Sequence, residues 1–287
     1  MINDKAEKPS SQTLIDALKK ASQFNSTETL KTEDIQLQIS NDSSTSSLLN
    51  KILSKSVPFS ELCRYTLGMQ VYHNTIHKKS DIENRIYHSD KKIDKTYFPE
   101  SGGMNVLPYI FNPKTKEYVS YGDWCYNKPD WDFCSKERIL IREIPSKTGL
   151  VCCISDTTHI PNKAVIIVIG KKNSNYLLLG ILNSKLMGFY VFQSTEKGKQ
   201  RLFPRVSLTT IKNLPFKKEM DSKITSEIEK GVKNIIALKN ELTESKLPTK
   251  VEQIKQRIEH SEEKINQLVY ELYELTDEEI KIVGGEK

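Results

Sequence analysis

The sequence lacks the short motifs that mark several common catalytic domains. It contains neither GxGxxG nor GxxxxGK[ST], the glycine-rich loops that place phosphates at a helix N-terminus. It also has no Pro-Pro pair, which the base-holding motif of amino-methyltransferases requires, and no GxSxG hydrolase elbow. We therefore expect no catalytic centre and no cofactor-binding site in this chain.

Long apolar runs are also missing. The longest candidates, Ala164–Gly170 and Tyr176–Leu182, are far shorter than the roughly 18 apolar residues needed to cross a membrane. The first residues, Met1–Ser11, are polar and contain no apolar core of a signal peptide. These features predict a cytoplasmic protein with no membrane partner.

Cysteine is scarce and shows no paired spacing. An odd number of cysteines argues against a disulfide framework. Cys152 and Cys153 would point to opposite faces of a strand, where they cannot easily share a zinc ion. We expect buried free thiols at all five positions, Cys63, Cys125, Cys134, Cys152 and Cys153.

The charge balance is only mildly basic. The net charge of +6 permits a polyanionic partner such as nucleic acid without requiring one. Three histidines, at positions 73, 77 and 88, have no cysteine or carboxylate at a firm spacing. They are predicted to be solvated loop side chains, not metal ligands.

Asp130 and Glu137 form the nearest approach to a nuclease site. A metal-dependent nuclease pattern would place a lysine where Ile139 stands, so no cation is positioned to activate a water molecule. We interpret the two acids as ordinary loop and strand-start residues. A Mg²⁺-dependent nuclease remains an alternative.

Composition divides the chain into three predicted parts. Residues 1–56 form a polar N-terminal segment, residues 57–216 an α/β domain, and residues 217–287 a helical hairpin. Within the first part, 14–21 suits a short helix and 35–39 a strand, and Ser40–Ser47 is predicted to be a linker.

The middle part mixes strand and helix patterns. Arg138–Ile144 alternates apolar and charged residues, which predicts a half-buried strand. Val151–Ile154 and Ala164–Ile169 are β-branched and apolar, as in central strands. Tyr176–Phe192 carries apolar residues at helical spacing, so one long helix is expected.

The last part predicts two helices with facing apolar stripes. The stripes run over Ile224–Leu242 and Val251–Leu275, and Lys246-Leu247-Pro248 separates them. The fold class is therefore α/β of the α+β type: a mixed-sheet domain followed by a C-terminal antiparallel helical hairpin.

Four segments together resemble the TaqI-like C-terminal specificity domain, over about residues 57–283. They are Phe59–Tyr72 with its Gly68 turn, Lys136–Ile144 (KERILIREI), Tyr176–Pro215 with Leu182–Leu186 (LNSKL) and the closing Leu-Pro, and Ile265–Val283, where Asn266 replaces the usual aspartate. That domain follows the N6-adenine methyltransferase in many type IIG restriction enzymes and is related in plan to type I specificity subunits.

The resemblance implies DNA target recognition in a bacterial restriction–modification system, without catalysis by this chain. It implies two partners: double-stranded DNA, and an N6-adenine methyltransferase or nuclease domain that would hold AdoMet and Mg²⁺. The helical hairpin would be a spacer and docking region. A protein–protein adaptor on the same fold is the other open alternative.

If the chain binds DNA, its polar basic loops are expected to contact the phosphates. Asn183 and Ser184 of the LNSKL motif are predicted to make packing contacts and not to read bases. The predicted DNA-contacting residues are Lys78, Lys79, Arg85, Lys91, Lys92, Lys95, Arg142, Lys197, Lys199, Arg201 and Arg205.

Overall fold

The centre of the fold is a mixed five-stranded sheet in the order β2-β10-β7-β8-β5. The computed structural model describes residues 43–194 and 205–285. Neighbouring strands are antiparallel except the parallel pair β5–β8. The strands are β2 (Cys63–Leu67), β10 (Val165–Gly170), β7 (Arg138–Arg142), β8 (Cys152–Ser155) and β5 (Tyr109–Ile110). The expected mixed α/β fold class is confirmed.

Both faces of this sheet are buried, because neighbouring residues on a strand point to opposite sides. On β7, Ile139 and Ile141 enter the main core, whereas Leu140 enters a smaller core on the other face. Cys152 and Cys153 divide in the same way. All five cysteines are buried and free, as expected.

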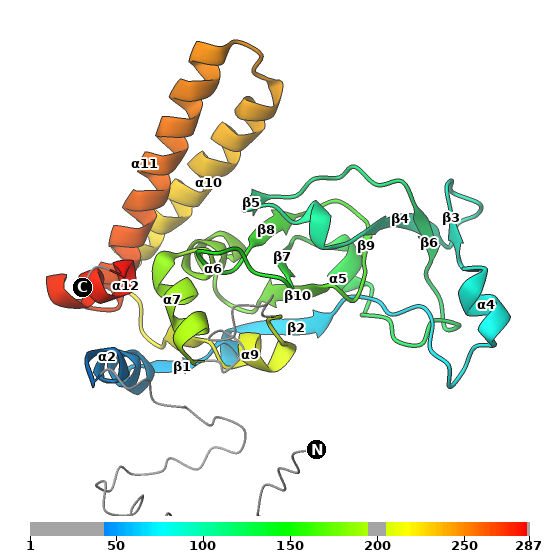
Figure 1. Ribbon diagram of the computed structural model, residues 1–287, viewed down its shortest axis with the longest axis horizontal. Helices are drawn as coiled ribbons and strands as arrows, with labels where there is room; N and C mark the ends of the chain where they lie inside the picture. The colour runs from blue at the N-terminus through cyan, green and yellow to red at the C-terminus, as the bar shows by residue number, and fades with distance from the viewer. Residues whose placement is uncertain (1–42, 195–204, 286–287) are drawn as a thin grey trace, which may run out of the picture. The chain divides into compact units, whose positions relative to one another are not determined.

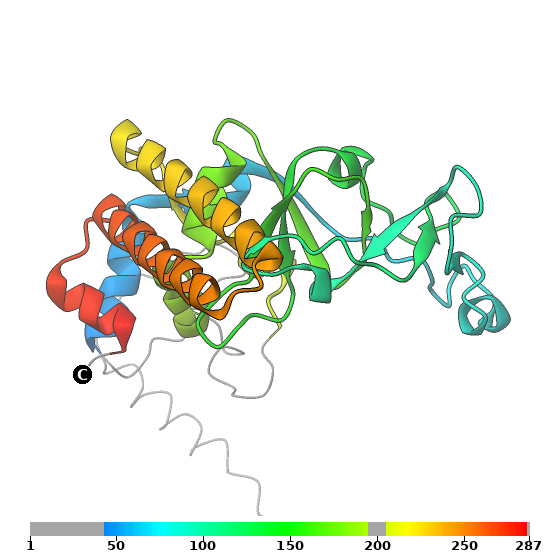
Figure 2. The same cartoon turned by 90° about the horizontal axis from the view of Figure 1, so that it is seen from above.

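A second, smaller sheet has the order β3-β6-β4-β9. Its strands are β3 (His88–Ser89), β6 (Tyr118–Ser120), β4 (Tyr97–Ser101) and β9 (Ile160–Pro161). It packs on a third apolar cluster that includes Met69, Val119 and Ile160. Figures 1 and 2 show this sheet at the opposite end of the described residues from the long helices.

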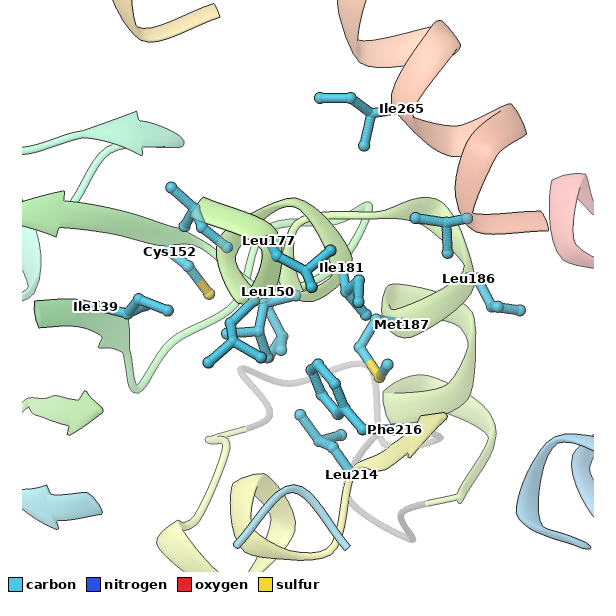
Figure 3. Close-up of a cluster of buried hydrophobic side chains, with 14 of the residues drawn as sticks. Ile139, Leu150, Cys152, Leu177, Ile181, Leu186, Met187, Leu214, Phe216 and Ile265 are labelled. Carbon is cyan, nitrogen blue, oxygen red and sulfur yellow. The ribbon is translucent and has the colours of Figure 1, made fainter. Parts of the chain in front are cut away.

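Helices pack mainly on the main-core face of the central sheet, whereas Phe133 of α5 joins the smaller core on the other face. The shorter helices are α2 (Ser43–Ser54), α3 (Phe59–Leu62), α4 (Lys79–Glu83), η1 (Gly103–Asn105), α5 (Asp132–Ser135), α6 (Asn175–Leu182), α7 (Lys185–Ser194) and α9 (Leu208–Lys212). The apolar helices α6 and α7 supply Leu177, Ile181, Leu186 and Met187 to the main core (Figure 3).

The predicted helical hairpin is present as α10 (Ser222–Glu244) and α11 (Pro248–Leu272), followed by α12 (Asp277–Gly284). Pro248 is at the first position of α11, where its missing N–H costs nothing. The predicted stripes pack together through Ile228, Val232, Ile254 and Ile265, among others. The hairpin is not a detached spacer, because a side chain at Gly180 of α6 would lie 2.6 Å from Ile228.

The structure corrects the expected linker. Ser43–Ser47, the described part of the predicted linker, begins helix α2, and Leu48, Leu49 and Ile52 of this helix are buried in the main core. Lys51 of α2 forms an ion pair with Glu279 of α12 at 2.6 Å. The helix and strand expected at 14–21 and 35–39 lie outside the described residues.

Strand β1 (Ser56–Pro58) joins the two ends of the predicted middle region. It pairs antiparallel with β11 (Pro215–Lys217), and Phe59 stacks on Phe216 with ring centroids 4.3 Å apart. The predicted domain boundaries at 56/57 and 216/217 therefore lie within the paired strands β1 and β11. No helix in the described residues is long and apolar enough to cross a membrane.

Candidate nucleic-acid interface

A groove of about 440 Å³ opens where the chain passes between the two sheets. Its polar lining comes from Gln70, Tyr72, Arg85, His88, Glu100, Asn162 and Lys163. These side chains offer donors, acceptors and positive charge on one surface. Such a set suits contact with phosphates and base edges.

Gly68 makes this crossing possible. A Cβ atom at this position would lie 2.1 Å from the carbonyl oxygen of Asn162, so only glycine allows the backbones to approach so closely. The amides of Gly68 and Met69 donate to the carbonyls of Val165 and Pro161 at 2.8 and 2.7 Å. The expected glycine turn after β2 is therefore the point that fixes one wall of the groove.

A half-buried Tyr–His–Glu chain lines the groove. The Tyr72 hydroxyl lies 2.9 Å from His88 Nδ1 and accepts a hydrogen bond from the amide of Tyr87 at 2.9 Å. His88 Nε2 lies 3.4 Å from a Glu100 carboxylate oxygen, and both side chains are nearly buried. Burial raises the pKa of Tyr72 to about 12, so its hydroxyl keeps its proton at neutral pH.

These contacts correct the prediction for the three histidines. His88 is not solvated, because it is held between Tyr72 and Glu100. His77 Nε2 lies 2.9 Å from the carbonyl oxygen of Trp124, and the His73 ring stacks on Tyr126 at 4.1 Å. Loop folding brings in these aromatic partners, which sequence spacing alone did not reveal.

Arg85 is the predicted DNA contact that lines the groove. Its backbone is left-handed, with φ of 48°, a conformation that non-glycine residues rarely adopt. Its guanidinium donates to Glu117 at 2.9 Å, and the side chain remains half exposed. Strained positions of this kind are frequent at functional sites.

Asn162 and Lys163 also line the groove, and both lie in the turn between β9 and β10. The Asn162 amide nitrogen of the backbone donates to the Ser101 carbonyl at 2.8 Å, and its side-chain oxygen accepts from the Ala164 amide at 3.1 Å. Lys163 is exposed and makes no ion pair within the described residues. Sequence reasoning missed Gln70, Asn162 and Lys163, since no motif links them.

The other predicted contacts of the basic loop surround α4 and β3. Lys79 pairs with Glu83 at 3.6 Å, and Lys92 lies over the Phe98 ring at 5.8 Å. Lys78, Lys91 and Lys95 are exposed. The structure thus places these lysines near the small sheet, but none of them lines the groove as Arg85 does.

The remaining predicted contacts are separate from this loop. Arg142 is only partly exposed, and its Nε donates to the Ile144 carbonyl at 2.6 Å. Arg205 is exposed and lies 3.5 Å from a Glu143 carboxylate oxygen. Lys197, Lys199 and Arg201 lie outside the described residues. All eleven assignments remain predictions.

The LNSKL motif has a structural explanation. The expected single helix is interrupted between α6 and α7, where the Asn183 side chain bonds both backbone groups of Cys152, at 3.0 and 3.1 Å. The Ser184 hydroxyl donates to the Ile181 carbonyl at 2.7 Å, and Asn266 accepts a hydrogen bond from the Lys185 amide at 2.9 Å. Asn266 thus caps the first turn of α7.

Arg138 departs from the predicted half-buried pattern of β7. It is fully buried, and its guanidinium donates to the carbonyls of Lys136 and Thr157 at 2.7 and 2.9 Å. Close by, His159 is held by the Ser101 and Ser155 hydroxyls at 2.6 and 3.1 Å. Burial, and then the charge of Arg138, lower the pKa of His159 to about 3. This polar network fixes the loop that precedes β9.

The two acids of the nuclease alternative have separate partners. Asp130 lies 3.8 Å from Arg64, and Glu137 accepts a hydrogen bond from the Asn175 amide at 2.9 Å. Among residues 43–194 and 205–285, no group of three or more His, Cys, Asp or Glu side chains is placed to share a metal ion. Their interpretation as ordinary loop and strand-start acids stays a prediction.

Part of the chain is similar to a family of specificity domains. Residues 99–216 match the family model of the TaqI-like C-terminal specificity domain, which confirms the expected resemblance for this part of the chain. The match begins in β4 and ends in β11. It leaves out the first and fourth segments on which the resemblance also drew. No curated protein matches the sequence.

Solved structures give more distant likenesses. The type IIL restriction-modification enzyme MmeI in complex with DNA is 12% identical, with a TM-score of 0.48, over 79% of this chain and 35% of that one. The type IIG restriction endonuclease BpuSI is 13% identical, with a TM-score of 0.41, over 81% and 33%. The HsdS subunit from Thermoanaerobacter tengcongensis is 9% identical, with a TM-score of 0.37, over 91% and 56%. The chain thus spans about a third of the length of the first two.

Proposed function

We propose that this chain is the target-recognition module of a bacterial restriction–modification system and that it binds double-stranded DNA. The family match over residues 99–216 carries this proposal, because it identifies a specificity domain. The proposed DNA-binding surface is the groove that Arg85 and Lys163 line. It also includes the exposed lysines of the loop around α4.

The catalytic chemistry would belong to a partner. We propose an N6-adenine methyltransferase or nuclease domain, in cis or in trans, which would hold AdoMet and Mg²⁺, and a cytoplasmic location together with the DNA. This chain would bind the DNA target and orient it for the catalytic domain. Its α10–α11 hairpin is the proposed docking region, because it projects from the opposite end to the small sheet (Figure 1).

Salt-dependent binding to DNA tests the proposal. The full chain would be incubated with a pool of duplexes that carry a randomised core, and the enriched duplex would be used to measure Kd at several salt concentrations. Each phosphate contact contributes about one unit to the slope of log K against log salt. Arg85→Ala and Lys163→Ala should each weaken binding and lower this slope by about one unit.

Lys172→Ala is the matched control. Lys172 is an exposed lysine just beyond the far end of β10, whereas Lys163 lies just before its start. The control should bind as the wild type does. Absence of enrichment, or affinity that does not change with salt, would refute DNA reading and favour the protein–protein adaptor.

A further inference from the structure

Met104 is the most exposed large apolar side chain in the described residues. It is 85% exposed, compared with 67% for Leu247 at the hairpin turn. An isolated apolar side chain at a protein surface is common and needs no special explanation. The backbone turn that carries Met104, however, is braced by several hydrogen bonds.

The η1 turn that carries Met104 is braced by Asn105. The Asn105 side-chain oxygen accepts from the Gly102 amide at 2.8 Å, and its nitrogen donates to the carbonyls of Asn112 and Lys114 at 2.8 and 2.9 Å. The Asn112 amide also donates to the Asn105 carbonyl at 2.8 Å. The turn is therefore closed on itself, and Met104 projects from it.

The same turn is joined to the groove. A Cβ atom at Gly102 would lie 2.9 Å from the Asn162 side chain, and one at Gly103 would lie 3.1 Å from Arg142 Cγ. Two glycines thus let the turn sit directly against the wall formed by Asn162 and against Arg142. Met104 stands at the edge of the proposed DNA-binding surface.

Cationic residues flank this turn. Lys114 and Lys163 are exposed and make no ion pair within the described residues, and Arg142 lies against Gly103. Leu107, at 39% exposure, is the one other exposed large hydrophobic residue in this loop. This apolar area is too small for a stable protein interface, which needs several hundred square ångströms on each partner. A single unbranched side chain between cations instead matches the apolar wedges that enter DNA base steps.

We propose that Met104 inserts into a base step of the bound duplex and locally unstacks it, while Arg142, Lys114 and Lys163 hold the flanking phosphates. This inference rests on the proposed function. The proposed insertion deforms the DNA target, in addition to the contacts with phosphates and base edges. A flexible base step would then be favoured at one position of the recognised sequence.

The test uses the full chain and the duplex enriched from the randomised pool. The fluorescent base 2-aminopurine, which brightens when it is unstacked, would replace one purine at a time along this duplex. The wild type and Met104→Leu should brighten one position, because leucine and methionine are both large apolar side chains that serve as wedges between base steps. Met104→Ala should abolish this signal and weaken binding by about five- to tenfold.

Leu247→Ala is the control, since Leu247 is also an exposed hydrophobic residue but lies in the α10–α11 turn. It should change neither affinity nor fluorescence. Salt-dependent binding by the wild type with no brightened position, or full affinity in Met104→Ala, would overturn the wedge and leave DNA reading intact. Failure of the wild type to bind any duplex would overturn both proposals.

Discussion

Replacing Asn183 tests whether the LNSKL motif serves the fold or the DNA. In Asn183→Ala, the backbone amide and carbonyl of Cys152 both lose a partner, at a residue with no exposed surface. A buried polar group left unsatisfied costs about 1–3 kcal/mol, so the two together should cost about 2–5 kcal/mol. That is a large share of the roughly 5–15 kcal/mol by which domains are stable.

Urea denaturation followed by circular dichroism would measure this loss as a lower midpoint. Asn240→Ala is the matched control, because Asn240 is an exposed asparagine on α10. At low temperature, where the variant is still folded, Asn183→Ala should bind the enriched duplex as the wild type does. An unchanged urea midpoint combined with lost DNA binding would refute the structural role and make Asn183 a base reader.

Two further predictions concern pH. Because the pKa of His159 is lowered to about 3, the unfolded chain binds more protons than the folded one between that value and about 6.5, and this group should remove about 2 kcal/mol of stability between pH 7 and pH 5. In urea titrations at several pH values, His159→Gln should lose this part of the pH dependence of stability. The exposed control His260→Gln should retain it. An equal dependence of stability on pH in both variants would contradict the lowered pKa of His159. Hydrogen bonds from Lys217 and Lys55 lower the pKa of Glu274 to about 2 from 4.5, so its stabilisation is present above pH 4.5 and disappears as the pH falls toward 2. Glu274→Gln should be less stable at pH 7 and flatter in acid than the exposed control Glu252→Gln, and an unchanged acid response would argue against the ion pairs.

The sequence predicted best those elements whose pattern repeats over many residues. The stripes of α10 and α11 continue for several turns, and the break at Lys246–Pro248 lies where the structure places it. The runs Val151–Ile154 and Ala164–Ile169 also become central strands, with bounds that differ by one residue or so. In these elements, burial on one or two faces determines which positions are apolar. The local sequence is therefore sufficient to predict the element.

Predictions failed where distant contacts decide the local structure. Ser43–Ser47 is polar, yet it enters a helix because Leu48, Leu49 and Ile52 have a core to pack against. Tyr176–Phe192 is helical by period, but the pairing of Asn183 with Cys152 divides it. Arg138 is buried because its guanidinium donates hydrogen bonds to the backbone carbonyls of Lys136 and of the distant Thr157.

The candidate site could be predicted only in part. Arg85 lies within a basic concentration that is visible in the sequence. Gln70, Asn162 and Lys163 meet it only because Gly68 brings the end of β2 against the β9–β10 turn. This contact between distant segments depends on how the two sheets are arranged. It produces no spacing pattern in the sequence from which the site could be predicted.

The pairing of β1 with β11 also sets an order of events during synthesis. Ser56–Pro58 cannot find its partner until Pro215–Lys217 has been translated, and at about 5–20 residues per second this takes about 8–30 s. The apolar surface of α6 stays uncovered for longer, because Ile228 and Ile265, which pack over it, are translated later. On the ribosome, the region that would read DNA and the helices that follow it therefore complete their folding together. The nascent chain must be protected from aggregation until α11 has emerged.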